Sequence, residues 1–145
     1  MKKFKFNLDP LLEMRDWEEQ KARQGLAEAN ARVNDACQRI DSCKSELEST
    51  YASWQTAGQV KFTAVERLAM QSQITEVESR ILQAETSLQE AEQGRVKAME
   101  ALKVASRNKK VVENLKEKRL QEYRAELLKK ESMEIEDIFN ARRSA

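Results

Sequence analysis

The side chains in this chain that could do covalent or acid–base chemistry are two thiols and many carboxylates. The thiols belong to Cys37 and Cys43, 25 Asp and Glu residues supply the carboxylates, and the sequence has no His. Six residues along a helix separate the two cysteines by about 9 Å, too far for a local disulfide, so free cytosolic thiols are the simpler interpretation. The sequence contains no Gly-rich phosphate loop and no metal-ligand cluster. We therefore expect no metal and no cofactor.

The carboxylates do not by themselves indicate an active site. General acid–base catalysis requires a concave site that excludes water and shifts the pKa of the catalytic group. The helices predicted below form a two-helix rod, which offers no such pocket. We therefore predict that the protein is not an enzyme.

The composition is typical of long helices. The chain of 145 residues has three Gly, one Pro, 35% charged residues and 6% aromatic residues, which leaves little material for loops. Its 26 basic residues nearly cancel the 25 acidic ones, which argues against a nucleic-acid partner. No apolar run approaches the roughly 20 residues of a membrane span, and the basic start lacks the apolar stretch of a secretory signal.

A first helix is predicted from about residue 10 to about residue 57. Asp9 suits the N-cap, and Pro10 suits the first helical position. Large residues recur at every seventh position and small ones follow three residues later, as at the a and d positions of a heptad. The a residues are Leu26, Val33, Ile40, Leu47 and Trp54, and the d residues are Ala22, Ala29, Ala36, Cys43, Thr50 and Ala57. Gly58 is expected to end this helix in a left-handed conformation.

A second helix is predicted from about residue 64 to about residue 142, after a turn at about 58–63. Thr63 and Glu66 fit a capping box, in which each side chain bonds the backbone N–H of the other residue. The heptad pattern then resumes. Its a residues are Ile74, Ile81, Leu88 and Leu102, and its d residues are Val77, Ala84, Ala91, Ala98, Ala105 and Val112.

These signals predict an all-α fold, an elongated antiparallel two-helix coiled coil forming a single domain over residues 1–145. The short turn requires the helices to fold back on each other, so that a positions face d positions and Leu26 faces Ala91 or Ala98. The acidic start of the first helix should then lie beside a basic stretch of the second. That stretch contains Lys103, Arg107, Lys109 and Lys110. Because the second helix is longer and its heptad pattern fails at Lys109, Lys116 and Arg119, about thirty residues should overhang without an intramolecular partner.

Three features admit two or more interpretations. Arg95 occupies an a position beside Gly94, and it either extends its charge out of a solvated seam or acts as a register pin or local weak point in the pairing. The segment before the first helix, with Phe4 and Phe6, could pack on the base of the second helix, bind a partner, or lie on a membrane surface. The basic stretch from Lys103 to Lys130 is better explained as a solvated helix face than as a nucleic-acid site, because Glu residues interrupt it.

Two stretches resemble the flagellar FliJ family of type III export components. They are the opening KFKFNLDPLLEMRDWEEQKAR and the tail VVENLKEKRLQEYRAELLKKESMEIEDIF. The resemblance implies a cytoplasmic coiled-coil protein, peripheral to the membrane at most, shaped like the stalk of a rotary ATPase. It implies three partners: the hexameric export ATPase, the cytoplasmic domain of the export gate, and export chaperones. The family has no enzymatic residues to carry over.

The candidate sites follow from this resemblance and from the unpaired apolar residues at the helix ends. The surface expected to face the ATPase consists of Leu8, Leu11, Leu12, Arg15, Leu115, Lys118, Arg119 and Tyr123. The residues proposed to contact the gate or a chaperone are Met70, Ile74, Val77 and Ile81, for which packing between the helices is the favoured role. A generic coiled-coil scaffold and a secretion chaperone are the alternative functions.

Overall fold

Two long helices make up almost all of the protein in the computed structural model, which describes residues 2–58 and 63–144. Helix α1 is Asp9–Ala57 and helix α2 is Ala64–Ser144. No strand occurs within the described residues, and the two helices pack against each other, so the predicted all-α hairpin is confirmed. Most of the turn expected at 58–63 lies outside the described residues.

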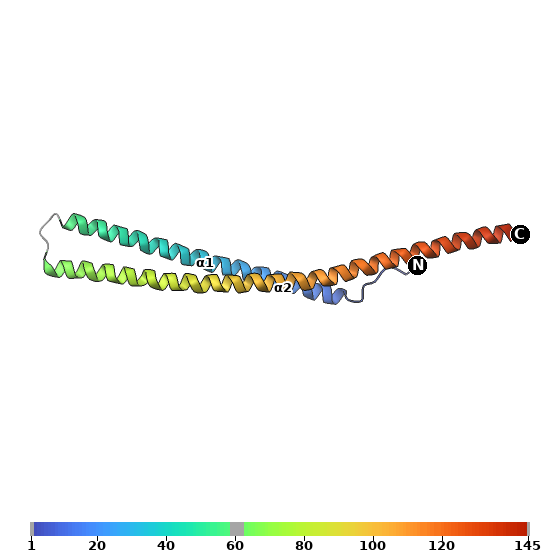
Figure 1. The fold of residues 1–145 in the computed structure, drawn as a ribbon, viewed down its shortest axis with the longest axis horizontal. Coiled ribbons are helices and arrows are strands. Elements are labelled where there is room, and N and C mark those ends of the chain that lie inside the picture. Colours follow the sequence, from blue (N-terminus) through green and yellow to red (C-terminus); the bar gives the residue numbers. More distant parts are fainter. Residues whose placement is uncertain (1, 59–62, 145) are drawn as a thin grey trace. The chain divides into compact units, whose positions relative to one another are not determined.

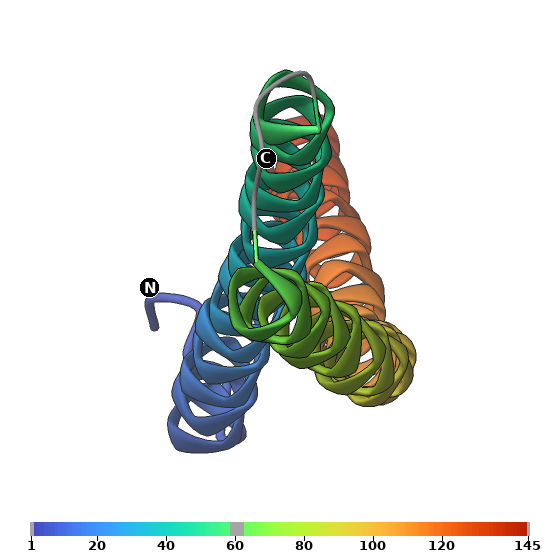
Figure 2. The ribbon, with the colours of Figure 1, turned by 90° about the vertical axis from the view of Figure 1, so that its left-hand side faces the viewer.

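The contacts within the chain define two units. Ala22–Leu102, here the hairpin unit, contains most of α1 and the first half of α2. Met1–Lys21 and Lys103–Ala145, here the terminal unit, contain the start of α1, the second half of α2 and the segment that precedes α1. Figures 1 and 2 show α1 and α2 running side by side in opposite directions within the hairpin unit.

Helix α1 begins one residue earlier than its sequence suggested. The Leu12 N–H donates to the Leu8 carbonyl over 2.9 Å, which gives the N-cap position to Leu8. The Asp9 carboxylate, expected to cap the helix, accepts a bond from Lys116 Nζ at 2.9 Å. The Asp9 carboxylate therefore forms an ion pair with α2, where the sequence predicted a helix cap.

Helix α2 begins as predicted, whereas α1 ends differently. The Thr63 N–H donates to Glu66 Oε2 over 3.2 Å and the Glu66 N–H donates to Thr63 Oγ1 over 3.3 Å, so the capping box is formed. The prediction that Gly58 adopts a left-handed conformation is wrong, because no described glycine has a positive φ. The Gly58 N–H donates to the Trp54 carbonyl over 2.9 Å, which continues the helical bonding by one residue without a left-handed turn.

The heptad residues form the seam of the hairpin unit, as predicted. The most buried are Ala29, Val33, Ala36, Ile40, Thr50, Ile74, Val77 and Ala84. Thr50 is accommodated because its hydroxyl donates to the Glu46 carbonyl over 2.8 Å. Arg95 lies at an a position and is exposed, which agrees with a side chain that extends out of the seam.

Two pairs of polar side chains define the antiparallel register in the hairpin unit. Arg80 donates two hydrogen bonds to the carboxylate of Glu46, at 2.9 and 3.2 Å, and the Tyr51 hydroxyl donates to Glu78 over 3.3 Å. Counting in opposite directions from these pairs brings Leu26 close to the level of Ala98. Of the two predicted neighbours, Ala98 is therefore favoured over Ala91.

Candidate partner-binding site

The segment that precedes α1 packs on α2 in the terminal unit. Phe6 is only 5% exposed, with Lys116 Nζ 5.9 Å and Arg119 Cζ 5.7 Å from its ring centroid. The Phe4 ring lies 5.6 Å from the Tyr123 ring, tilted by 47°, and the Tyr123 hydroxyl donates to the Lys2 carbonyl. Of the three interpretations of this segment, packing on the second helix is the one observed.

Ion pairs join the start of α1 to the same part of α2. Lys109 Nζ lies 2.8 Å from Asp16, 3.9 Å from Glu19 and 3.7 Å from Glu113. The hydrogen bond to Asp16 raises the pKa of Lys109, partial desolvation opposes the rise, and the charges of the three carboxylates add to it. Lys109 thus contacts the acidic start of α1 as predicted. The pair between Lys116 and Asp9 was not foreseen, because Lys116 appeared only as a break in the heptad pattern.

All eight residues expected to face an ATPase lie in the terminal unit. Leu8, Leu11, Leu12, Arg15, Leu115 and Tyr123 are half-buried, whereas Lys118 and Arg119 are exposed. Arg15 also pairs with Glu18 at 3.0 Å. The structure brings Arg119 and Tyr123 together beneath the segment of residues 2–8, so part of the expected surface is already occupied by the chain itself.

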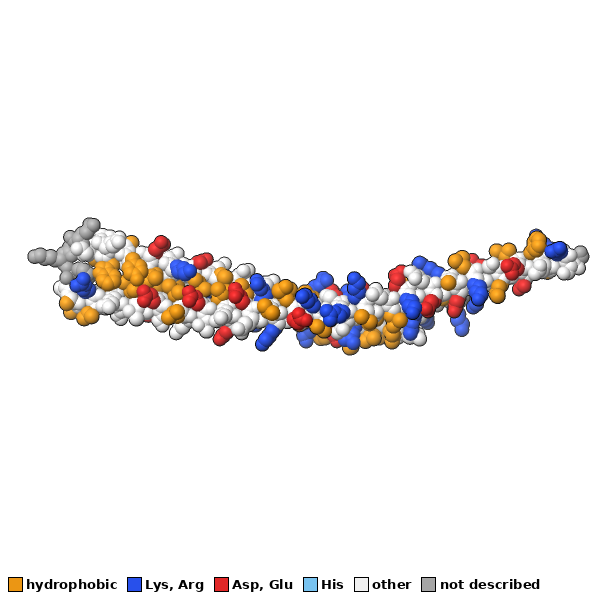
Figure 3. All heavy atoms as spheres, viewed as in Figure 1, with side chains coloured by type: hydrophobic (Ala, Val, Ile, Leu, Met, Phe, Trp, Pro, Cys, Tyr) orange, Lys and Arg blue, Asp and Glu red, His pale blue; other side chains and the backbone are white. Residues whose placement is uncertain are grey.

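The stretch of α2 without an intramolecular partner is shorter than the thirty residues predicted. The segment before α1 covers α2 as far as Tyr123, and residues 128–144 are all exposed. Large apolar side chains in this tail lie among charged ones (Figure 3). The apolar residues with more than half of their surface exposed are Leu128, Met133, Ile135, Ile138 and Phe139. The prediction failed because it counted only the helical part of the N-terminal region as a possible cover.

The four residues suggested for a gate or chaperone contact belong to the seam of the hairpin unit. Val77 has no exposed surface and Ile74 is buried, while Met70 and Ile81 are half-buried. The structure instead exposes other apolar residues on this part of α2, namely Val65, Leu68 and Leu82. The signal that could have found them is an apolar residue outside the a and d positions of the heptad.

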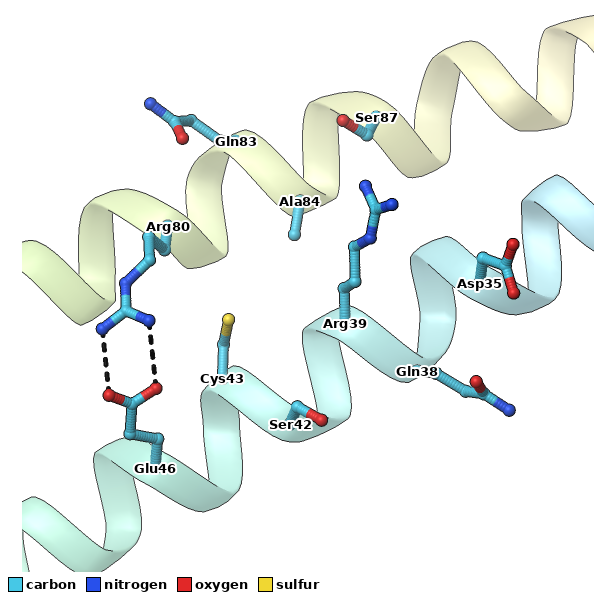
Figure 4. Close-up of a pocket in the computed structure, with 10 residues that line it drawn as sticks. All are labelled: Asp35, Gln38, Arg39, Ser42, Cys43, Glu46, Arg80, Gln83, Ala84 and Ser87. Atoms are coloured by element: carbon cyan, nitrogen blue, oxygen red, sulfur yellow. Dashed lines mark hydrogen bonds and ion pairs between the residues drawn. The ribbon is translucent and has the colours of Figure 1, made fainter.

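An open polar groove of about 660 Å³ runs along the hairpin unit, and Figure 4 shows its lining. Small side chains, among them Ser42, Cys43, Ala84 and Ser87, form much of its wall. The Arg80–Glu46 pair closes one end. Hydrogen bonding to Glu46, followed by its charge, raises the pKa of Arg80. The charged pair of this groove therefore joins the two helices.

The fold and the side chains at the helix ends define the class of protein to which this chain belongs. This is an α-helical hairpin with a hydrophobic heptad seam and aromatic, apolar and cationic side chains at its helix ends, a surface suited to binding other proteins. None of the helices, over their described residues, has a stretch long and apolar enough to cross a membrane.

Comparison with known proteins gives the family. Residues 4–143 match the family described as flagellar FliJ protein, and the chain belongs to that family. No curated protein and no solved structure matches the chain. The protein is thus related to flagellar export, in a family whose role is non-catalytic.

Proposed function

We propose that this protein is a non-catalytic component of flagellar type III export that binds and stimulates the export ATPase ring. The observation that carries the proposal is membership of the FliJ family over residues 4–143. In this proposal the protein acts in the cytoplasm, at most peripherally at the export apparatus. It links the ATPase to the export gate and helps to cycle export chaperones.

The terminal unit is the proposed ATPase-binding surface. Lys118 and Arg119 present exposed charges beside the half-buried Leu115 and Tyr123, and this mixture of apolar side chains with cations is typical of protein interfaces. Binding here could favour one state of the ATPase subunits over another, which changes turnover without supplying any catalytic group.

The hairpin unit is the proposed contact for the gate or a chaperone. Ile74 and Val77 are enclosed between the helices, so a partner bound to the intact hairpin would reach the margins of the seam at Met70 and Ile81. The exposed Leu68 and Leu82 lie on the same stretch of α2 and add apolar surface for such a partner. They are the first residues to substitute in a test of this contact.

The decisive experiment is ATP hydrolysis by a flagellar export ATPase titrated with this protein. The proposal predicts saturable stimulation at well below one copy per ATPase subunit, as expected when one chain serves a whole ring. Lys118→Glu should weaken the stimulation, whereas Lys97→Glu, the same change at an exposed site of the hairpin unit, should leave it unchanged. No stimulation by a helical, folded protein would refute the ATPase role.

A further inference from the structure

The segment of residues 2–8 is held on α2 by side chains and not by regular backbone pairing. Phe6 lies under the two cations Lys116 and Arg119, and Phe4 contacts Tyr123. These three residues of α2 follow at spacings of three and four, so they lie along one face of the helix. Just after the segment, Asp9 pairs with Lys116 at 2.9 Å.

The contacts define what this face of α2 recognises. The Lys116 ammonium and the planar Arg119 guanidinium lie over the face of one aromatic ring, the Tyr123 ring contacts a second, and Lys116 also donates to a carboxylate. In the chain these ligands are Phe4, Phe6 and Asp9. The recognised pattern is therefore two aromatic residues separated by one residue, with a carboxylate three residues later.

The segment is also held in a way that permits its release. The polar contacts are individually weak, since the Asp9–Lys116 pair is partly exposed and the cation–ring distances are near the limit of attraction, so the buried Phe6 ring is the main anchor of the segment. Ordering an extended segment costs conformational entropy that these contacts must offset. An open cleft of about 790 Å³ lies between the segment and α2, bordered by Phe4, Tyr123, Glu126 and Lys130, and it gives an incoming chain access to one edge of the contact.

We propose that the face of α2 formed by Lys116, Arg119 and Tyr123 is a binding site for an extended aromatic and acidic peptide segment, and that the N-terminal segment of this chain occupies it as an intramolecular competitor. A partner segment with the same pattern displaces residues 2–8, and its carboxylate competes with Asp9, the first residue of α1, for Lys116. The part of this inference that concerns the export ATPase rests on the proposed function, because Arg119 and Tyr123 belong to the surface assigned there. The existence of the site does not depend on it.

A peptide of residues 2–9 supplied separately tests the site directly. The full-length chain with Phe4→Ala and Phe6→Ala should bind this labelled peptide at least tenfold more tightly than the unsubstituted chain, whose own segment fills the site. Adding Lys116→Ala and Arg119→Ala to that variant should remove the gain. Phe139→Ala, which changes an exposed ring of the tail, should leave peptide affinity as it is in the unsubstituted chain.

Two results would overturn the inference. One is equal peptide affinity for the unsubstituted chain and the Phe4→Ala/Phe6→Ala variant, and the other is binding that ignores the loss of Lys116 and Arg119. Both substituted phenylalanines lie outside α1 and α2, and circular dichroism verifies that the variant has the helicity of the unsubstituted chain.

Binding to the export ATPase separates this inference from the proposed function. Competition predicts that the Phe4→Ala/Phe6→Ala variant binds the ATPase more tightly than the unsubstituted chain, whereas weaker binding would make the segment part of the interface and contradict competition. If the variant gains peptide binding but does not bind the ATPase, the proposed function is refuted and the peptide site remains supported. If the chain stimulates the ATPase but no variant binds the peptide, the peptide site is refuted and the proposed function remains supported.

Discussion

Single charged side chains account for much of what distinguishes the terminal unit from an ordinary heptad pair. Lys109 and Lys116 each hold a carboxylate from the start of α1 within 2.9 Å. Such partly exposed pairs contribute modestly to stability individually, because water and salt screen them. Their value is to align the start of α1 and the preceding segment with a particular stretch of α2.

The Lys109 pairing predicts a loss of stability at alkaline pH. Because the folded state raises the pKa of Lys109 above its ordinary 10.5, the pairing stabilises the fold below that pH and is lost as pH rises through the folded pKa. Asp16→Asn should therefore show a smaller decrease in melting temperature between neutral pH and about pH 11. Tyr51, whose pKa is raised by burial and by Glu78, titrates in both proteins and cancels in the comparison. Identical alkaline curves would contradict the assignment.

At the scale of the helices, large-against-small packing holds the hairpin unit together. Its seam is narrow because alanines occupy many d positions, and Val77 is its most enclosed side chain, with no exposed surface. The glycines at 25 and 94 meet nothing within 4 Å where a Cβ would be added, so space remains beside the helices at those two points. The seam is therefore tight around Val77 and open near Arg95.

Shortening Val77 tests the tight part of the seam. Val77→Ala should lower the free energy of unfolding by about 2 kcal/mol, from lost apolar burial and the cavity left behind. Val65→Ala is the matched control, because Val65 is 75% exposed and its substitution should change stability by no more than about 0.5 kcal/mol. Chemical denaturation measures both, and equal effects would show that the seam does not enclose Val77 in solution.

Replacing Arg95 tests the open part. Arg95→Leu places an apolar side chain at an a position and should raise the melting temperature by about 2–4 °C, as roughly 1 kcal/mol of added burial does in a chain of this size. Lys97→Leu, at an exposed position of α2 outside the a and d positions, serves as the control for general loss of charge. A lower or unchanged melting temperature for Arg95→Leu would contradict the view that Arg95 weakens the pairing.

At the scale of the whole chain, the two units give the proposed activities separate locations. The hairpin unit has its own buried seam, and the terminal unit carries the segment of residues 2–8 with its cationic partners. Charge also differs between them. The hairpin unit has nine basic and twelve acidic residues, and the terminal unit has seventeen basic and thirteen acidic residues. The terminal unit is thus the more basic of the two, and its net charge would favour an acidic partner surface in the proposed interaction.

Truncation after Lys110 tests this separation. The shortened chain loses Lys116, Arg119 and Tyr123 and should no longer stimulate the ATPase, while the seam residues of the hairpin unit all remain. Circular dichroism should show cooperative melting of a folded hairpin, and an ATPase titration should show no stimulation. Full stimulation by the truncated chain would exclude the end of α2 as the ATPase-binding surface.

The helices and their buried faces could be predicted from local sequence pattern. Heptad spacing and the Thr63–Glu66 capping box depend on residues within one or two turns of each other, so local periodicity was sufficient to predict α2's start and the residues of the seam. Resemblance at the two ends of the chain also predicted the family that the comparison shows.

The contacts at the ends of the chain could not be predicted from local pattern. Lys116 and Arg119 break the heptad pattern when α2 is considered alone, yet they contact Phe6, which lies more than a hundred residues earlier. Asp9 likewise forms an ion pair with Lys116, although its place in the sequence predicted a helix cap. Such contacts follow from the register of the two helices and from the course of a non-helical segment. Periodicity carries no information about either, because it describes one helix at a time.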